Sequence, residues 1–233
     1  MIIEHKNLRI FFGDQTSSVS VQDLQAGSIS APVQQLINQE KLYKASGRQV
    51  HGDAIIEVAA SVDYWREQEA DALQTALFGM GLAVFTADCL PIVLYDSFHH
   101  AFCVVHSGWK GALAGIAQKT VQSMQYTYQT QLNQIEVFLG PAARGCCYEI
   151  QPDLYDLILK QGTTQSVAFK DGKIYFDLSL FVVERLVNLG ISSANIYTNN
   201  NVCTICTQGY CSYRNEKEHA GRQITLAWQK DLR

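Results

Sequence analysis

Apolar residues recur along the chain with two periods, and each period predicts one type of element. Runs rich in β-branched and aromatic residues predict strands at Ala54–Ala59, Leu82–Thr86, Leu90–Tyr95, Ala101–Val105, Ile135–Leu139, Asn195–Thr198 and Gln223–Trp228. Apolar residues at helical spacing predict helices over Pro32–Tyr43, from Gly111 to about Tyr128, and over Pro152–Lys160 and Asp177–Leu189. The segment before Ser30 is polar and weakly patterned.

Residues at the ends of these segments support the helix predictions. In the first predicted helix, Ser30 is a candidate N-cap and Pro32 lies at an early helical position. In the last one, Asp177 is the candidate N-cap and Gly190 ends the helix. Helices and strands are interleaved, but several strands are joined by short turns. This order predicts an α/β (α+β) fold with mixed β-sheets and helices outside, rather than a regular parallel array. A length of 233 residues is expected to give a single domain, 1–233.

Composition and charge exclude several classes of protein. With 47% hydrophobic and 17% charged residues, the chain is not a disordered one. A net charge of −4 argues against nucleic acid as a partner. The absence of 18 consecutive apolar residues argues against a membrane span, and Glu4 lies where a signal peptide would be apolar, so we expect a cytoplasmic protein. The odd number of cysteines, seven, favours reduced thiols.

The most informative segment holds two apolar runs, Leu90–Tyr95 and Ala101–Val105, separated by a polar tip. Such a pair predicts a β-hairpin. A two-residue tip sets Cys89 directly opposite His106, and a four-residue tip sets the two residues diagonally. In either register their side chains share one face within reach of each other. Pro91 cannot donate to a central ladder, so it favours an edge strand or a bulge.

A second histidine, His51, lies directly before Gly52 at a predicted bend. Together with Cys89 and His106 it forms a set of three ligands that suits a catalytic zinc site with one open position. Without His51, the same pair fits a metal-free hydrolase in which His106 activates Cys89 as the nucleophile. A purely structural alternative is that Cys89 is a small core residue and that the two histidines only pack in the core or face solvent.

Six short motifs follow one another along the chain. They are Gln49–Gly52, Ala70–Leu73, Thr86–Pro91, His106–Gly111, Gly140-Pro141 with Cys146–Ile150, and Ser212–Arg214 with Gly221-Arg222. In this order they resemble the signatures of the multicopper polyphenol oxidase (laccase) domain family, which is also described as purine nucleoside phosphorylase-like and as a peptidoglycan editing factor family. The motifs span about residues 45 to 225, and an ordered set is far more specific than any one of them.

This resemblance implies a layered α/β/β/α domain with a zinc site whose ligands fall on His51, Cys89 and His106. It implies that the substrates are small molecules, a purine nucleoside and phosphate. The implied reactions are phosphorolysis of adenosine, inosine or methylthioadenosine, and deamination of adenosine. Copper-dependent oxidation of polyphenols and a role on peptidoglycan precursors are associated with other members. Copper is thus a possible metal, but multicopper oxidation needs more histidines than the six present. We therefore expect a zinc enzyme acting on purine nucleosides.

The chain departs from the family pattern near its N-terminus. The family has an arginine and a glycine pair in an element that lines the site, and here these positions read Gln15 and Ser17-Ser18. A glutamine cannot supply the fixed charge that an arginine gives a phosphate, so a catalytically weakened homologue is an alternative. Lys110 stands where arginine is usual, which keeps the charge but loses bidentate geometry.

Three residues are candidates for catalysis or substrate binding. Asp88, beside Cys89, orients a ligand or moves a proton, unless alternation points it to the opposite face as a solvated or capping acid. Lys110 stands at the start of a predicted helix, where backbone N–H groups favour anions, and otherwise is an ordinary exposed lysine. Arg214 binds substrate or serves as a structural tie to a loop carbonyl.

The remaining cysteines are less informative. Cys203 and Cys206 have the spacing of a metal knuckle, with Cys211 nearby. One such pair without a second is a weak sign of another zinc site. We interpret the adjacent Cys146-Cys147 as structural.

Overall fold

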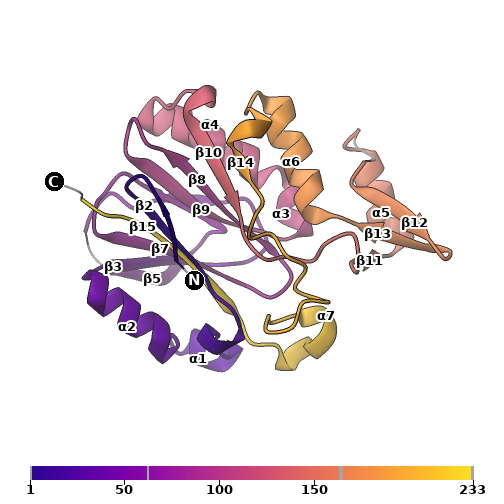
Figure 1. The fold of residues 1–233 in the computed structure, drawn as a ribbon, viewed down its shortest axis with the longest axis horizontal. Coiled ribbons are helices and arrows are strands. Elements are labelled where there is room, and N and C mark those ends of the chain that lie inside the picture. Colours follow the sequence, from indigo (N-terminus) through magenta and orange to yellow (C-terminus); the bar gives the residue numbers. More distant parts are fainter. Residues whose placement is uncertain (1, 62, 163–164, 232–233) are drawn as a thin grey trace.

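Two six-stranded sheets form the centre of the protein, as shown by a computed structural model that describes residues 2–61, 63–162 and 165–231 (Figure 1). In spatial order the first sheet contains β1 (Ile2–His5), β2 (Leu8–Phe12), β15 (Gln223–Gln229), β7 (Met80–Thr86), β3 (Tyr43–Arg48) and β5 (Tyr64–Glu69). The second contains β14 (Ile196–Tyr197), β10 (Ile135–Leu139), β8 (Leu90–Asp96), β9 (Ala101–Ser107), β6 (Ala72–Thr75) and β4 (Ile55–Glu57). Both sheets combine parallel and antiparallel pairs, which confirms the prediction of mixed sheets.

Helices cover the outer faces of the two sheets. Within the described residues the α-helices are α1 (Val21–Gln25), α2 (Ala31–Glu40), α3 (Trp109–Ala114), α4 (Ile116–Tyr128), α5 (Pro152–Leu159), α6 (Leu178–Leu189) and α7 (Tyr213–Glu216). The first two pack on the first sheet, and α3, α4 and α6 pack on the second (Figure 1). Residues such as Val84 and Val93 fill the layer between the sheets. The α/β/β/α layering is therefore confirmed. In the described part of the chain, no helix is long and apolar enough to cross a membrane.

Two predicted helices have different limits from those expected. α2 follows Ser30 but ends at Glu40, because Lys41 adopts a left-handed conformation. The single helix expected up to Tyr128 is divided into α3 and α4 by Gly115, whose φ of 81° breaks the helical path. α6 has the predicted ends: the Asp177 carboxylate accepts a hydrogen bond from a backbone N–H of the first turn, and the helix stops at a left-handed glycine.

The predicted hairpin is formed by β8 and β9, and Pro91 is opposite His106. Asp96 pairs with Ala101, so the tip has four residues and Cys89 lies diagonal to His106. The expectation from Pro91 was wrong, because β8 lies inside the sheet between β10 and β9. The ladder with β10 begins only after the proline, so the missing N–H falls where the pairing starts.

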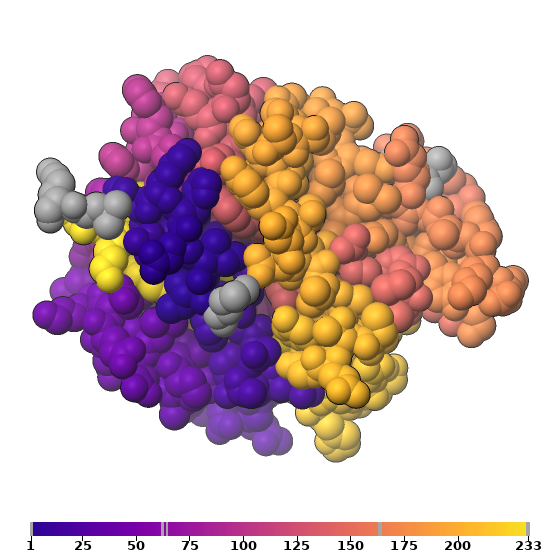
Figure 2. Space-filling model, in the orientation of Figure 1, coloured from indigo at the N-terminus to yellow at the C-terminus, as the bar shows by residue number. Residues whose placement is uncertain are grey.

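Short strands account for the elements that the pattern did not predict. β1 and β2 form a hairpin in the segment expected to be weakly patterned, with Leu8 and Ile10 buried on one face. This hairpin pairs with β15, so the N- and C-terminal strands lie side by side, indigo against yellow (Figures 1 and 2). A third sheet of β11 (Glu149–Ile150), β13 (Lys173–Phe176) and β12 (Val167–Lys170) lies outside the two layers.

Candidate active site

Three side chains from three separate parts of the fold meet beside the ends of the two sheets. His51 lies between β3 and β4 and Cys89 between β7 and β8, both in connections that cross from the first sheet to the second. His106 lies on β9. The Cys89 sulfur and one nitrogen of each ring lie within 4.8 Å of one another, and the two rings meet edge to face at 4.8 Å. The predicted set of possible metal ligands is thus brought together.

A fully buried carboxylate, Asp71, organises this cluster. It accepts a hydrogen bond from Nδ1 of His106 at 2.6 Å, and backbone N–H groups of Val50, His51 and Gly52 donate to the same carboxylate at 2.7 to 3.2 Å. The loop that carries His51 is therefore wrapped around Asp71, the acid that orients His106. A carboxylate on Nδ1 leaves Nε2 of His106 as the nitrogen available to a metal. Asp71 is within the Ala70–Leu73 motif, but the sequence did not indicate this role.

The charges in the cluster shift the protonation of its members. Burial raises the pKa of the Cys89 thiol, but the imidazoles of His106 and His51 outweigh burial and bring it down to about 6. Burial lowers the pKa of His106, and the thiolate of Cys89 together with Asp71 raises it to about 9. Burial also opposes ionisation of Asp71, yet its bonds to His106 and the backbone N–H groups leave its pKa below the ordinary value. The arrangement favours a thiolate, the form in which cysteine binds metals.

The backbone around the cluster is built for close approach. A Cβ atom on Gly108 would lie 2.9 Å from Cδ2 of His51 and 3.0 Å from the sulfur of Cys89, so only glycine fits there. His51 has a φ of 61° and Asp88 a φ of 82°, a left-handed conformation that is uncommon for residues with side chains. Strain of this kind concentrates at functional sites.

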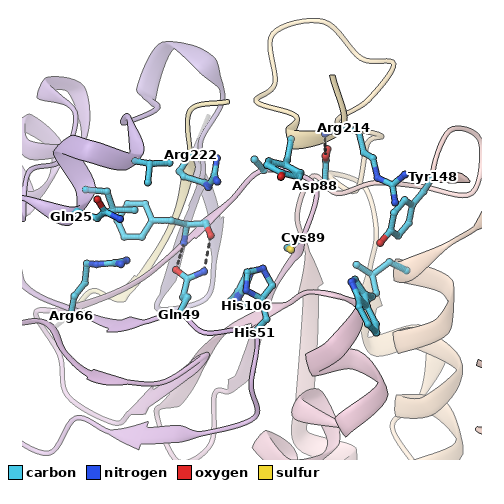
Figure 3. A pocket seen from close by; sticks show the side chains of 17 residues that line it. Gln25, Gln49, His51, Arg66, Asp88, Cys89, His106, Tyr148, Arg214 and Arg222 are labelled. Carbon is cyan, nitrogen blue, oxygen red and sulfur yellow. Dashed lines mark hydrogen bonds between the residues drawn. The ribbon is translucent and has the colours of Figure 1, made fainter. Parts of the chain in front are cut away.

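The cluster lies on the wall of a cavity of about 520 Å³ (Figure 3). Arg66 and Arg222 lie on one side of the cluster, and Tyr148 and Arg214 lie on the other. The carbonyls of Ala220 and Gly221 accept hydrogen bonds from Nη1 of Arg222, which holds that side chain in place. The cavity therefore joins a possible metal site to positive charge and to an aromatic surface, a combination suited to an anionic or aromatic small molecule.

Another residue of the first motif fixes the loop beside the cavity. The side-chain amide of Gln49 donates to the carbonyl of Phe85 at 2.7 Å and accepts from its N–H at 2.8 Å, as the dashed lines in Figure 3 show. These two bonds continue the pairing of β3 with β7 by the equivalent of one residue past the end of β3. They hold the start of the loop that carries His51.

The predicted catalytic and binding residues take different positions. Asp88 lines the cavity, and its two carboxylate oxygens accept hydrogen bonds from the Thr204 hydroxyl and the Arg214 N–H, both at 2.7 Å. Arg214 lines the cavity as well; its guanidinium lies over the Tyr148 ring and donates to the backbone carbonyl of Glu149, at the start of β11 rather than in a loop. Both interpretations of that arginine thus have a structural basis.

Lys110 is separate from this group. It is exposed, its ammonium lies 5.5 Å from the centre of the Trp109 ring, and among the described residues Trp109 rather than Lys110 lines the cavity. This position agrees with the alternative interpretation, in which Lys110 is an ordinary exposed lysine.

The altered N-terminal element lies away from the cavity lining. Gln15 borders a shallow second pocket beside residues 204–210, and its N–H donates to the carbonyl of Gly209. Ser17 is buried, and its hydroxyl exchanges hydrogen bonds with the backbone of Asp14. Ser18 donates to the carbonyl of Gln15. The cavity nevertheless has three arginines, two of which, Arg66 and Arg222, sequence reasoning did not place there. Only the closing Gly-Arg motif gave a signal for the second.

Four of the remaining cysteines form a second cluster, which the sequence interpretation missed. Cys146 and Cys147 lie against Cys203 and Cys206, and all four sulfurs are within 4.8 Å of one another. Cys146 and Cys147 therefore supply the second pair of ligands that Cys203 and Cys206 lacked in the sequence. Cys211 is buried elsewhere, beside Ala87 and Ala220. Four cysteines and a His/Cys group in such clusters indicate that the protein binds metal.

The sequence of this chain matches a known family of proteins. The chain belongs to the family described as multi-copper polyphenol oxidoreductase laccase, which matches residues 7–230. The resemblance inferred from the six motifs is thus confirmed.

Individual relatives carry a more specific name. A purine nucleoside phosphorylase of Xylella fastidiosa (strain 9a5c) is 35% identical over 188 residues, which cover 78% of this chain and 70% of the relative. One from Clostridium acetobutylicum is 32% identical over 186 residues, covering 78% and 75%. Among solved structures, the hypothetical protein YfiH of Bacillus licheniformis matches with a TM-score of 0.81 at 24% identity, over 98% of this chain and 96% of that one. The chain is a member of the purine nucleoside phosphorylase group by homology.

Proposed function

We propose that the protein is a zinc-dependent enzyme that cleaves purine nucleosides with phosphate. The observation that carries this proposal is the cluster of His51, Cys89 and His106 on the wall of a cavity that also contains three arginines and aromatic side chains. The names of the relatives supply the substrate class. Adenosine, inosine and methylthioadenosine are the nucleosides to test first.

The residues of the cluster fit a zinc ion. One sulfur and two imidazole nitrogens are a donor set that zinc accepts, and three protein ligands leave one position for another molecule. Asp71 fixes the ring of His106 through Nδ1, and the missing Cβ of Gly108 leaves room for the ligand side chains. A bound zinc ion would supply a Lewis acid at the cavity wall.

Phosphorolysis breaks the bond between ribose C1′ and the purine nitrogen and forms a bond between C1′ and a phosphate oxygen. The electron pair of the broken bond leaves with the purine, which takes up a proton. The phosphate therefore needs fixed positive charge, and the leaving base needs a proton donor. Arg66 and Arg222 supply charge on one side of the cavity, and Tyr148 with Trp109 offers aromatic faces for the base.

Asp88 and Arg214 have linked roles in this scheme. Asp88 accepts a hydrogen bond from the backbone N–H of Arg214 and so fixes the backbone that carries this side chain, while the Glu149 carbonyl and the Tyr148 ring hold the guanidinium. The Asp88 carboxylate also lines the cavity and is the candidate to move the proton that the base requires. Lys110 contributes only long-range positive charge from the surface.

The reaction is tested by incubating the protein with inosine or adenosine, with and without phosphate, and separating the products by chromatography. We expect free base and ribose 1-phosphate only when phosphate is present, and His51→Ala is the control. Inosine formed from adenosine would reveal deamination in the same experiment. Free base that appears equally without phosphate, or in the control, contradicts the proposal.

A variant tests which side of the cavity binds phosphate. Arg222→Gln keeps a polar side chain, although a shorter one, and removes the charge, so we expect the KM for phosphate to rise about tenfold. Lys110→Gln is the matched control and should change it less than about twofold, because that lysine is exposed outside the cavity. An equal effect of the two changes would exclude this placement of the phosphate.

A second candidate function rests on one further feature of the same residues. Asp71, His106 and Cys89 lie in a row, and the acid orients the histidine beside a thiol whose pKa is lowered to about 6. This is the arrangement of a cysteine nucleophile with its base. A thiol-alkylating reagent distinguishes the two functions: rapid labelling of Cys89 without a chelator supports the hydrolase, and labelling only after chelation supports the metal enzyme.

A further inference from the structure

The second cluster brings two loops together at the surface of the protein. Cys146 and Cys147 belong to the loop between β10 and β11, and Cys203 and Cys206 follow β14. Cys146 and Cys206 are exposed, Cys147 is partly exposed and Cys203 is buried. In Figure 2 these loops correspond to the coral and gold surfaces that meet at one side of the molecule. The cluster is separate from the residues that line the cavity.

The spacing of the sulfurs suits four ligands around one ion. Four Zn–S bonds of about 2.3 Å in a tetrahedron place the sulfurs about 3.8 Å apart. The sulfurs of Cys146 and Cys206 are 3.9 Å apart, and each of the four lies within 4.8 Å of the others. A disulfide would require a separation of about 2.05 Å. All four cysteines are free thiols in this arrangement.

The backbone holds the two loops in register independently of any ion. Ala142 and Cys203 form a parallel bridge, in which the Thr204 N–H donates to the carbonyl of Ala142 at 3.0 Å. The Thr207 N–H closes the turn of the knuckle on the carbonyl of Cys203. Backbone N–H groups of Arg144, Cys206 and Ile205 donate to the sulfur of Cys203. Such donors spread the negative charge of a metal-bound thiolate.

We propose that Cys146, Cys147, Cys203 and Cys206 bind a zinc ion in a closed, structural site. Four protein sulfurs complete a tetrahedron, so no position remains for substrate or water. The ion joins two loops that hydrogen bonds and packing in the core also hold. Its place at the surface, outside the cavity, excludes it from the reaction.

The position of this site gives it an effect on the cavity. Thr204, between the two cysteines of the knuckle, donates to Asp88, and the Asn215 amide donates to the carbonyl of Ile205. Tyr148 directly follows the other cysteine pair. The zinc ion would thus fix the cavity wall that carries both Tyr148 and Arg214. This consequence for substrate binding rests on the proposed function, whereas the metal site does not.

Elemental analysis of protein purified without chelator tests the site directly. We expect about two zinc ions per chain in the wild type, and about one in Cys206→Ser and in His51→Ala, because each variant removes a ligand from one site only. Cys146→Ser is a second variant that should lose the same ion as Cys206→Ser, and both changes lie at exposed positions. If the inner site binds no zinc but the four-cysteine site does, the wild type contains about one zinc ion per chain and Cys206→Ser contains none.

Two further measurements separate a metal site from other states of the thiols. Cobalt substitution should give intense sulfur-to-metal absorption, and Cys206→Ser should lose most of it, because the inner site supplies one thiolate and the outer site four. Amide-hydrogen exchange across residues 142–149 and 202–216 should become at least about tenfold faster in the same variant. The proposal is overturned by an equal zinc content in wild type and Cys206→Ser, by iron in place of zinc, or by an intact mass lower by two hydrogens for each disulfide.

Discussion

The two clusters of possible metal ligands differ in how the chain holds them. The inner cluster of His51, Cys89 and His106 takes its residues from a strand and from connections between the two sheets. The outer cluster of four cysteines takes its residues from two surface loops. An aspartate supports each cluster: Asp71 is fully buried, whereas the Asp177 side chain retains 18% of its exposure.

The two aspartates also bond to different groups. Asp71 binds the ring of a ligand and the backbone of the loop that carries another. Asp177 binds the guanidinium of Arg144, the N–H of Gly145 and the first turn of α6, but no cysteine in the described part of the chain. The inner side chains are therefore oriented before any metal arrives, as a catalytic centre requires. In the outer cluster the ion itself would orient the side chains, which is the behaviour of a structural site.

The same substitution at both aspartates tests this comparison, and its largest effect is expected at Asp71. Asp71→Asn replaces a buried carboxylate with an amide that cannot accept from all of its donors and cannot balance the charge of His106. We expect the free energy of unfolding to fall by about 3 kcal/mol and the affinity of the inner site for metal to fall by about 10- to 100-fold. Denaturant titration and zinc analysis measure the two effects. An unchanged zinc content in a folded variant would mean that Asp71 does not orient the ligands.

An intermediate effect is expected from a change that fills space beside the inner ligands. Gly108→Ala places a methyl group within 3.0 Å of Cys89 and His51, so one of them must move. We expect metal affinity to fall about tenfold and the free energy of unfolding to fall by about 1 to 2 kcal/mol. Titration with a metallochromic competitor measures the affinity.

The matched control for this change lies in the same site. A Cβ atom on Gly52 would lie 3.5 Å from its neighbours, an ordinary contact, and the N–H that donates to Asp71 is kept. Gly52→Ala should therefore bind metal as the wild type does. If both variants lose affinity equally, backbone flexibility rather than close approach explains the glycine at position 108.

The sequence predicted the inner cluster better than the outer one, and the reason is physical. His106 is on β9 and Cys89 directly precedes β8, the neighbouring strand of the hairpin, so the register of the hairpin places the two residues near each other. Asp71 and Arg222 reach the site through long-range pairing, for which a single chain gives no local signal. The four cysteines meet through two loops that are about 60 residues apart.

The same distinction applies to the fold. Long buried elements such as β8, β9 and α6 were predictable because their apolar residues recur over several turns or strand positions. The hairpin of β1 and β2 was not, because each strand is only four or five residues long, too short to establish a clear period. Gly115 also ended a helix within a continuous apolar pattern, since its left-handed backbone changes direction without a change of hydrophobicity.

The smallest effect is expected from the outer aspartate. Asp177→Asn keeps a side-chain oxygen that caps α6, since asparagine and aspartate cap helices about equally well, but it removes the charge that holds Arg144. That ion pair is partly exposed, so we expect the free energy of unfolding to fall by less than about 1 kcal/mol. Asp177→Ala removes the cap as well and should cost about 1 kcal/mol more.

Neither change should release the inner metal, because Asp177 contacts no inner ligand among the described residues. Zinc analysis of the two variants together with Asp71→Asn therefore separates the clusters, and loss of the inner ion from Asp177→Asn would show that they are one cooperative unit.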